Sequence, residues 1–312
     1  MRRLILLFLT ALLAATAVPA AADAARRGQC LLRTSGPQCY LWTGKVTFIA
    51  DGDTVYVDVD GDGSRTRFPV RITGMNAMEQ TTYTSRASQR RGECHAVEAT
   101  ARLEQLLRAS KYKVRLLAQD PASRSQKRLR RSVAVKVKGR WIDVGRTMLT
   151  EGHAIWLPNH RESAWNRDYS ILQLRAQRAQ LNLWDPDYCG AGPAANLTVS
   201  VKYDAVGKDA SNLNGEYLRV VNHGSTAVSL AGWHVRDGGP YNYNFPSWAK
   251  VGAGKTIYVH VGRGTSSGVN FYWGRTKPVF DNPTRSPRYN GDGGYLFDPK
   301  GNLRASSMWP TR

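Results

Sequence analysis

The pattern of apolar residues changes at a run of small residues, Gly190 to Ala195, which has no periodicity and is typical of a linker. Before this run, strand-like segments alternate with helical stripes. After it, only short alternating segments separated by turn signals occur. A chain of 312 residues has the length of about two domains. We therefore expect a mainly β protein with an α+β domain followed by an all-β domain.

The first 24 residues have the features of a secretory signal peptide. Arg2 and Arg3 precede an apolar run from Leu4 to Leu13, and small residues follow as far as Ala24. That run is shorter than the ~20 residues that span a bilayer. We expect residues 1–24 to be cleaved and the mature protein to be secreted without a transmembrane segment.

Lys and Arg outnumber Asp and Glu by 44 to 24, which gives a formal charge of +20. The imbalance reflects a scarcity of acids, and it predicts a positive field that attracts polyanions. Nucleic acid, anionic cell-wall polymer and lipid headgroups all fit this charge. With 42% hydrophobic residues the chain is not a wholly disordered, collagen-like or coiled-coil protein.

The chain has four cysteines, an even number that an exported protein would normally pair. Three pairings are conceivable. We favour Cys30 with Cys39, which closes a short N-terminal loop, and Cys94 with Cys189, which ties the start of a helix to the end of the first domain. No close Cys-x-x-Cys pair is present, so a zinc site is not expected.

The first domain, residues 44–190, follows an N-terminal extension at 25–43 that holds Cys30 and Cys39. Its periodicity predicts strands at 45–49, 53–59, 67–72, 114–118 and 133–137, and helices at 93–109, 145–151 and 163–180. Five short strands interrupted by helices predict an OB-fold barrel with three helices beside it, and the outer face of such a barrel often binds nucleic acid.

Several residues of this domain suit phosphodiester hydrolysis. Asp51 and Asp53 flank a glycine at a turn, where two carboxylates could hold a hard cation. Arg71 is a candidate for stabilising negative charge on a phosphorane, and Glu79 is a candidate base for activating water. A second arginine is available in the run Lys127-Arg-Leu-Arg-Arg131.

Five segments in one order resemble the staphylococcal nuclease (thermonuclease) family from about Thr43 to Tyr188. They read IADGDTV, VRITGMNAMEQ, RRSVAVKVKGRWIDVG, LTEGHAIWLP and LRAQRAQLNLWDPD. The resemblance implies a Ca²⁺-dependent, sugar-nonspecific endonuclease that leaves 3′-phosphate ends. It assigns the two catalytic arginines to Arg71 and to Arg131 or Arg130, and the catalytic glutamate to Glu79. The calcium aspartate falls on Asp53, with Asp51 in support.

The second metal segment departs from the family pattern, because Asn76 stands where the family commonly has an aspartate. An amide oxygen can still coordinate a cation, but one negative charge is lost, so weaker Ca²⁺ binding or another metal preference is expected. The base and the arginines are retained, which favours an active hydrolase. The alternative is a non-catalytic extracellular protein that binds nucleic acid or the cell envelope.

Substrate contacts are expected along a basic segment and at one aromatic residue. Eight Lys or Arg and no acids lie between Arg124 and Arg140, including Lys127 and Arg128, and they form a candidate phosphate track. Trp156 lies where the family places an aromatic residue near the nucleotide base, and stacking on such a ring tolerates any base.

The second domain, residues 197–312, follows a linker at 191–196. Its segments LNGEYLRVVNHGSTAVSLAGWHVRD, VGAGKTIYVHVGRG and NGDGGYLFDPKGNL resemble a lamin tail domain. The resemblance implies an immunoglobulin-like β-sandwich, with Trp233 in its core. We expect an accessory unit for nucleic-acid, envelope or protein contacts, whose deletion would leave turnover of short oligonucleotides nearly intact.

Overall fold

The computed structural model describes residues 26–32, 36–239, 241–283 and 291–310. The expected signal peptide at 1–24 lies outside these residues. Within the described part of the chain, no helix is long and apolar enough to cross a membrane.

The first domain is a closed five-stranded barrel, as the sequence predicted. Its strands pair in the order β2-β3-β4-β10-β8, and β8 returns to β2 to close the ring. The only parallel pair in this ring joins β4 to β10. The barrel strands are β2 (Gln38–Ile49), β3 (Thr54–Val59), β4 (Arg67–Ile72), β8 (Lys113–Ala118) and β10 (Arg128–Val137).

Short strands complete this domain at its edges and ends. They are β1 (Arg26–Gln29), β5 (Met75–Asn76), β6 (Gln80–Thr82), β7 (Arg91–Gly92), β9 (Arg124–Ser125), β11 (Arg140–Asp143) and β12 (Ile155–Trp156). The β5–β12 pair is central to the candidate site because it aligns Asn76 with Ile155 and Met75 with Trp156.

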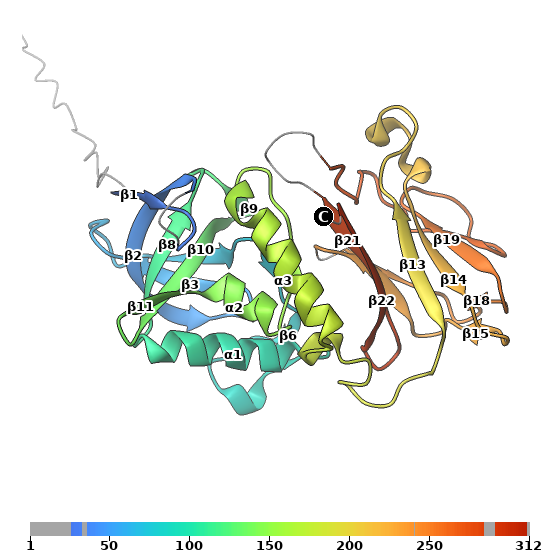
Figure 1. The fold of residues 1–312 in the computed structure, drawn as a ribbon, viewed down its shortest axis with the longest axis horizontal. Helices are drawn as coiled ribbons and strands as arrows, with labels where there is room; N and C mark the ends of the chain where they lie inside the picture. Colours follow the sequence, from blue (N-terminus) through green and yellow to red (C-terminus); the bar gives the residue numbers. More distant parts are fainter. Residues whose placement is uncertain (1–25, 33–35, 240, 284–290, 311–312) are drawn as a thin grey trace, which may run out of the picture.

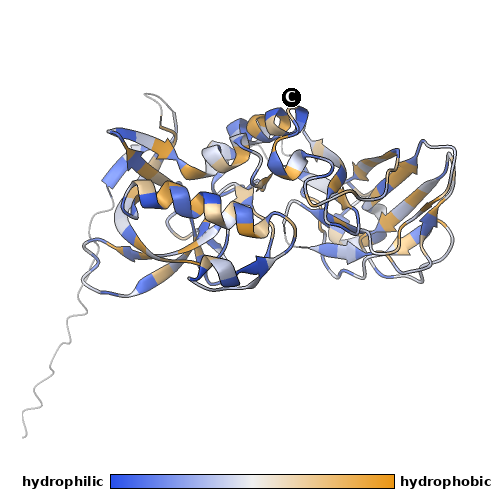
Figure 2. Cartoon of the chain, turned by 90° about the horizontal axis from the view of Figure 1, so that it is seen from below, coloured by the Kyte–Doolittle hydropathy of each residue, from blue (hydrophilic) through white to orange (hydrophobic). Residues whose placement is uncertain are grey.

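Three helices pack beside the barrel (Figure 1). They are α1 (Ala96–Ala109), α2 (Val144–Thr150) and α3 (Asn166–Arg178), with 3-10 turns at Ala87–Gln89, Ser163–Trp165 and Asn182–Trp184. The Asp143 side chain accepts a hydrogen bond from the backbone N–H of Arg146, which explains why α2 begins at Val144. Figure 2 shows apolar and polar residues alternating along strands and helices, the pattern of elements with one buried face.

The second domain is an immunoglobulin-like sandwich of two four-stranded sheets, ordered β13-β14-β19-β20 and β17-β16-β21-β22. Its Trp233 is fully buried in the core, as expected. Its strands are β13 (Leu197–Lys202), β14 (Tyr217–Asn222), β15 (Val228–Ser229), β16 (His234–Asp237), β17 (Asn242–Asn244), β18 (Lys250–Val251), β19 (Thr256–His260), β20 (Asn270–Tyr272), β21 (Asp292–Phe297) and β22 (Leu303–Trp309), with 3-10 turns at Asp209–Ser211 and Leu213–Gly215.

Both favoured disulfides are present. Cys30 pairs with Cys39 across 4.9 Å between their Cα atoms, and Cys94 pairs with Cys189 across 6.0 Å. The second bond joins the residues just before α1 to the end of the first domain, which is the position that the sequence suggested.

Candidate functional site

The Asp-Gly-Asp turn precedes β3, and Arg71 lies near the end of β4. The two strands form a hairpin whose register places Thr54 opposite Arg71. Asp53 therefore lies beside Arg71, and Arg71 Nη1 is 2.8 Å from Asp53 Oδ1. Both side chains are buried, so this is a desolvated ion pair that holds the arginine firmly in place.

Asn76 is the next residue of this network. The Arg71 guanidinium donates a hydrogen bond from Nη2 to Asn76 Oδ1. The other end of the amide, Nδ2, donates to the backbone carbonyl of Gly238 in the second domain at 3.1 Å. Asn76 is completely buried, so both ends of its amide contribute to a fixed bridge between the domains.

Asp51 and Asp53 are held as a close pair of carboxyl groups. Asp51 Oδ1 accepts a hydrogen bond from the Asp53 N–H at 3.0 Å, and Asp53 Oδ2 accepts one from the Ala77 N–H at 3.0 Å. Burial, together with the negative charge of Asp53, raises the pKa of Asp51 to about 8. A cation bound between the two would relieve this repulsion.

The donor set fits a hard divalent cation, with two carboxylates and the amide oxygen of Asn76 as its members. Within the described residues, no group of three or more His, Cys, Asp and Glu side chains is arranged to hold a metal ion. The Arg71 guanidinium also binds oxygens of both Asp53 and Asn76. The site therefore carries less negative charge than one with three carboxylates, and weaker Ca²⁺ binding or another metal preference stays a prediction.

Glu79 lies three residues beyond Asn76 and is partly buried. Burial and the charge of Asp53 raise its pKa, whereas the positive charges of Arg71 and Arg236 lower it. A carboxyl group with a raised pKa accepts a proton more readily, which suits a general base. The Glu79 N–H donates to Glu93 Oε2 at 3.1 Å, and this bond anchors the segment.

The pairing of β4 with β10 makes Arg130 the second arginine of the candidate site. The β4–β10 register pairs Arg130 with Arg71 and pairs Arg131 with Ile72. Because successive residues of a strand face opposite sides, Arg130 shares the face of Arg71. Burial first, and then the nearby charges of Arg71 and Arg128, lower the Arg130 pKa.

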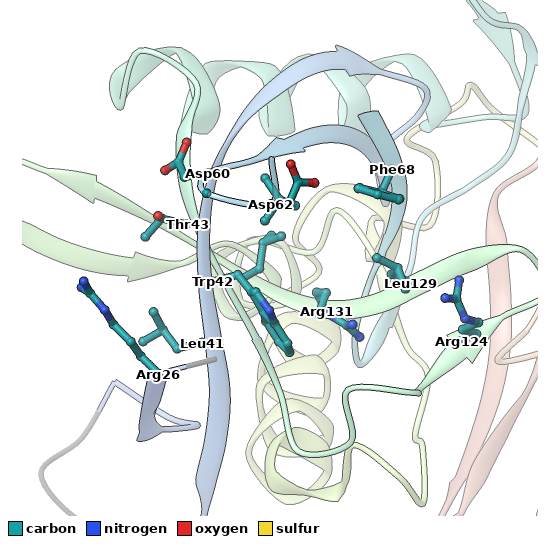
Figure 3. Close-up of a pocket in the computed structure, with 13 residues that line it drawn as sticks. Arg26, Leu41, Trp42, Thr43, Asp60, Asp62, Phe68, Arg124, Leu129 and Arg131 are labelled. Atoms are coloured by element: carbon teal, nitrogen blue, oxygen red, sulfur yellow. The ribbon is translucent and has the colours of Figure 1, made fainter. Parts of the chain in front are cut away.

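Arg131, the first choice from the sequence, is on the other face of β10. Its guanidinium carbon lies 4.6 Å from the ring centroid of Trp42, and Nη2 donates to the Pro121 carbonyl at 2.8 Å. It lines a cavity of about 480 Å³ together with Phe68 and Leu129 (Figure 3). The assignment of Arg131 beside Arg71 is therefore wrong, because strand alternation directs its side chain away from the site.

The candidate phosphate track, residues 124–140, starts with the β9–β10 hairpin. Arg124 and Lys127 are exposed there, and Arg128 Nη1 donates to Thr54 Oγ1 at 3.0 Å. Since Thr54 pairs with Arg71, this bond brings the basic hairpin to the edge of the site.

Trp156 does not offer a stacking face, contrary to the sequence prediction. It is 0% exposed, and its backbone N–H donates to Gln173 Oε1 of α3 at 2.5 Å. Strand β12 directs the ring into the core, so a nucleotide base cannot reach it.

Tyr83 is an exposed aromatic residue that the sequence analysis missed. Its side chain is 52% exposed, and the charges of Glu79 and Asp51 contribute to raising its pKa, after burial. It follows β6 in a segment without periodicity, so only its sequence proximity to Glu79 could have indicated it.

Arg236 of the second domain was also missed. It is 1% exposed, and its Nη1 lies 3.3 Å from Met78 Sδ and 3.9 Å from Glu93 Oε2. No sequence pattern links positions so far apart in the chain.

Comparisons with known proteins identify the second half of the chain. A search of curated proteins finds no match. The Lamin Tail Domain family matches residues 193–311, which include every strand of the sandwich. The sandwich is therefore a lamin tail domain.

Proposed function

We propose that this protein is a secreted, sugar-nonspecific nuclease that hydrolyses phosphodiester bonds of DNA and RNA. The supporting observation is the gathering of Arg71, Arg130 and Glu79 at one edge of the barrel, next to a buried pair of aspartates. The five thermonuclease-like segments support the same chemistry. The two disulfides fit an oxidising, extracellular compartment.

In this proposal Glu79 takes a proton from water as the water oxygen attacks phosphorus. The P–O5′ bond breaks, the 5′ oxygen takes a proton from solvent and leaves as a hydroxyl, and a 3′-phosphate end remains. Arg71 and Arg130 stabilise the charge that develops on the phosphoryl oxygens. Among the described residues, the buried Arg71 Nε has no hydrogen-bond partner, so in this proposal the Arg71 side chain shifts on substrate binding to bring its donors to a phosphate oxygen.

Asp53 and Asp51, with Asn76, would hold Ca²⁺, which would supply positive charge near the scissile phosphate. The exposed Arg124 and Lys127 would bind phosphates along the strand, so binding should weaken steeply with salt. Tyr83 replaces Trp156 as the proposed stacking platform.

One observation favours the alternative of a non-catalytic nucleic-acid or envelope-binding protein. Both terminal nitrogens of Arg71 are bound to Asp53 and Asn76. If neither bond is released, Arg71 cannot form a bidentate contact with a phosphate through its two terminal nitrogens. The basic hairpin would then bind nucleic acid without cleaving it.

The deciding experiment measures digestion of plasmid DNA and RNA by the mature protein, with Ca²⁺ and then with chelator. Glu79→Gln removes the proposed base and should lower kcat by about 100-fold or more. Glu98→Gln is the matched control, since Glu98 is exposed on α1.

We expect Ca²⁺-dependent cleavage by the native protein and by the Glu98 variant. No digestion with any of several divalent metals, or full activity of the Glu79 variant, would leave the binding function as the better account.

A further inference from the structure

The two domains share a buried interface beside α3 (Figure 1). Gln173 Nε2 donates to the Tyr295 hydroxyl at 3.1 Å, and Gln177 Nε2 donates to Ser306 Oγ at 2.9 Å. Four apolar residues of the lamin tail domain belong to the same buried cluster as the barrel: Tyr295, Phe297, Leu303 and Met308. The second domain is therefore packed against the first along one side of its β21–β22 pair.

This interface continues to the candidate site through the end of β16. Arg236 approaches Met78 and Glu93, and the Glu93 carboxylate in turn accepts the Glu79 N–H. The Gly238 carbonyl accepts the Asn76 amide. Both ends of the segment from Asn76 to Glu79 are thus held, directly or through Glu93, by the lamin tail domain.

Hydrogen bonds within the lamin tail domain hold the C-terminal end of β16 in place. Arg236 Nη2 donates to the Gly239 carbonyl at 2.7 Å, and the Gly238 N–H donates to Asp292 Oδ1 at 3.0 Å. A Cβ atom at Gly238 would lie 2.6 Å from Asp292 Oδ1 and 3.1 Å from the Trp156 carbonyl. A side chain here would clash with Asp292 of the same domain and press against the Trp156 carbonyl of the first domain, so glycine suits this close approach.

We infer that the lamin tail domain completes the candidate nuclease site, with Arg236 as a positioning residue for the segment that carries Asn76 and Glu79. Arg236 is too deeply buried to touch substrate. It supplies the buried charge that faces Met78 and Glu93, and it holds the loop that presents the Gly238 carbonyl.

This arrangement also accounts for the amide at position 76. The Gly238 carbonyl needs a donor, which asparagine provides and an ionised aspartate lacks. A carboxylate there would place two acceptors in contact within a buried interface. The consequence for turnover rests on the proposed function, whereas the anchoring of the segment can be measured without it.

The test uses the full chain with Arg236→Gln, Arg236→Lys and, as control, Arg219→Gln. Arg219 is an exposed arginine of β14 whose side chain donates to Ser200 Oγ within its own domain. Hydrogen exchange of the Glu79 and Gln80 amides should quicken about tenfold or more in Arg236→Gln, because an anchoring charge is lost. Exchange in β14 should not change.

Turnover of a short oligonucleotide supplies the second readout. Arg236→Gln should lower kcat by about 100-fold with little change in KM, because a small displacement of a catalytic base is costly. Arg236→Lys keeps the charge and should restore part of kcat. The control should match the native protein in both measurements.

Asn76→Asp tests the amide separately and should quicken exchange in the same segment. Unchanged exchange there in both Arg236→Gln and Asn76→Asp would overturn the inference. The inference would also be overturned if amide exchange quickened to the same extent throughout the chain in both Arg236 variants, because a loss of packing alone produces that result. If the native protein has no nuclease activity but the local exchange effect is seen, the anchoring stands and the proposed function fails.

Discussion

Arg130 and Arg131 are neighbours in the sequence, yet their side chains have opposite surroundings. Arg130 of β10 lies on the same face of the sheet as its β4 partner Arg71, and Arg131 lies over Trp42 in a cavity on the other face. Sequence analysis left both assignments open, because either arginine can be aligned with one family position. The pairing of β10 with β4 decides between them.

Replacing these arginines in turn should therefore separate catalysis from stability. Arg130→Ala should lower kcat by about 100-fold or more through loss of a preorganised donor. Arg131→Ala should leave kcat nearly unchanged and lower the free energy of unfolding by about 2–3 kcal/mol, because the carbonyls of Pro121 and Ser123 lose a buried donor.

Steady-state kinetics and urea unfolding of both variants check this prediction. A larger loss of kcat in the Arg131 variant than in the Arg130 variant would reverse the assignment.

At the scale of elements, α3 connects the barrel with the lamin tail domain. Its periodicity predicted a helix over 163–180, and the structure has a 3-10 turn at Ser163–Trp165 followed by Asn166–Arg178. Its apolar residues Tyr169, Leu172 and Ala176 are spaced three or four apart and are buried. The polar Gln173 is also fully buried, which the apolar periodicity did not indicate.

Gln173 should be among the most sensitive positions of this helix. Gln173→Ala leaves the Trp156 N–H and the Tyr295 hydroxyl without their partner and opens a cavity, so we expect a loss of about 2–4 kcal/mol. Arg167→Ala, on the exposed side of α3, should change stability by less than about 0.5 kcal/mol.

Urea unfolding followed by circular dichroism measures both values in the full chain. Equal stability of the two variants would show that the hydrogen bonds of Gln173 are energetically unimportant.

At the scale of the whole molecule, the two domains share one buried cluster. The linker at Gly190 to Ala195 suggested two separate domains, and deletion of the second domain was expected to leave turnover of short oligonucleotides nearly intact. The contacts of Gly238 and Arg236 change that expectation, since truncation removes the groups that hold Asn76 and Glu93.

The intact chain should accordingly unfold in one cooperative step. Scanning calorimetry with the disulfides oxidised should show a single transition, with equal calorimetric and van't Hoff enthalpies. Two resolved transitions, or melting curves that differ between near-ultraviolet and far-ultraviolet dichroism, would contradict a shared core.

The sequence alone determined the elements and the local chemistry of this protein. Strand and helix periods predicted the barrel and the sandwich, and the favoured cysteine pairs were confirmed. The meeting of Asp53 with Arg71 was predictable because it depends on one hairpin. Such features depend on residues close in the chain, where spacing carries the information.

Only the tertiary structure decided which arginine faces Arg71, whether Trp156 is accessible, and what surrounds Asn76. These depend on strand register and on the packing of the lamin tail domain against the barrel. Contacts between Asn76 and Gly238, or between Arg236 and Glu93, join residues more than a hundred positions apart. Such contacts depend on the shapes of two complete domains, so local periodicity does not predict them.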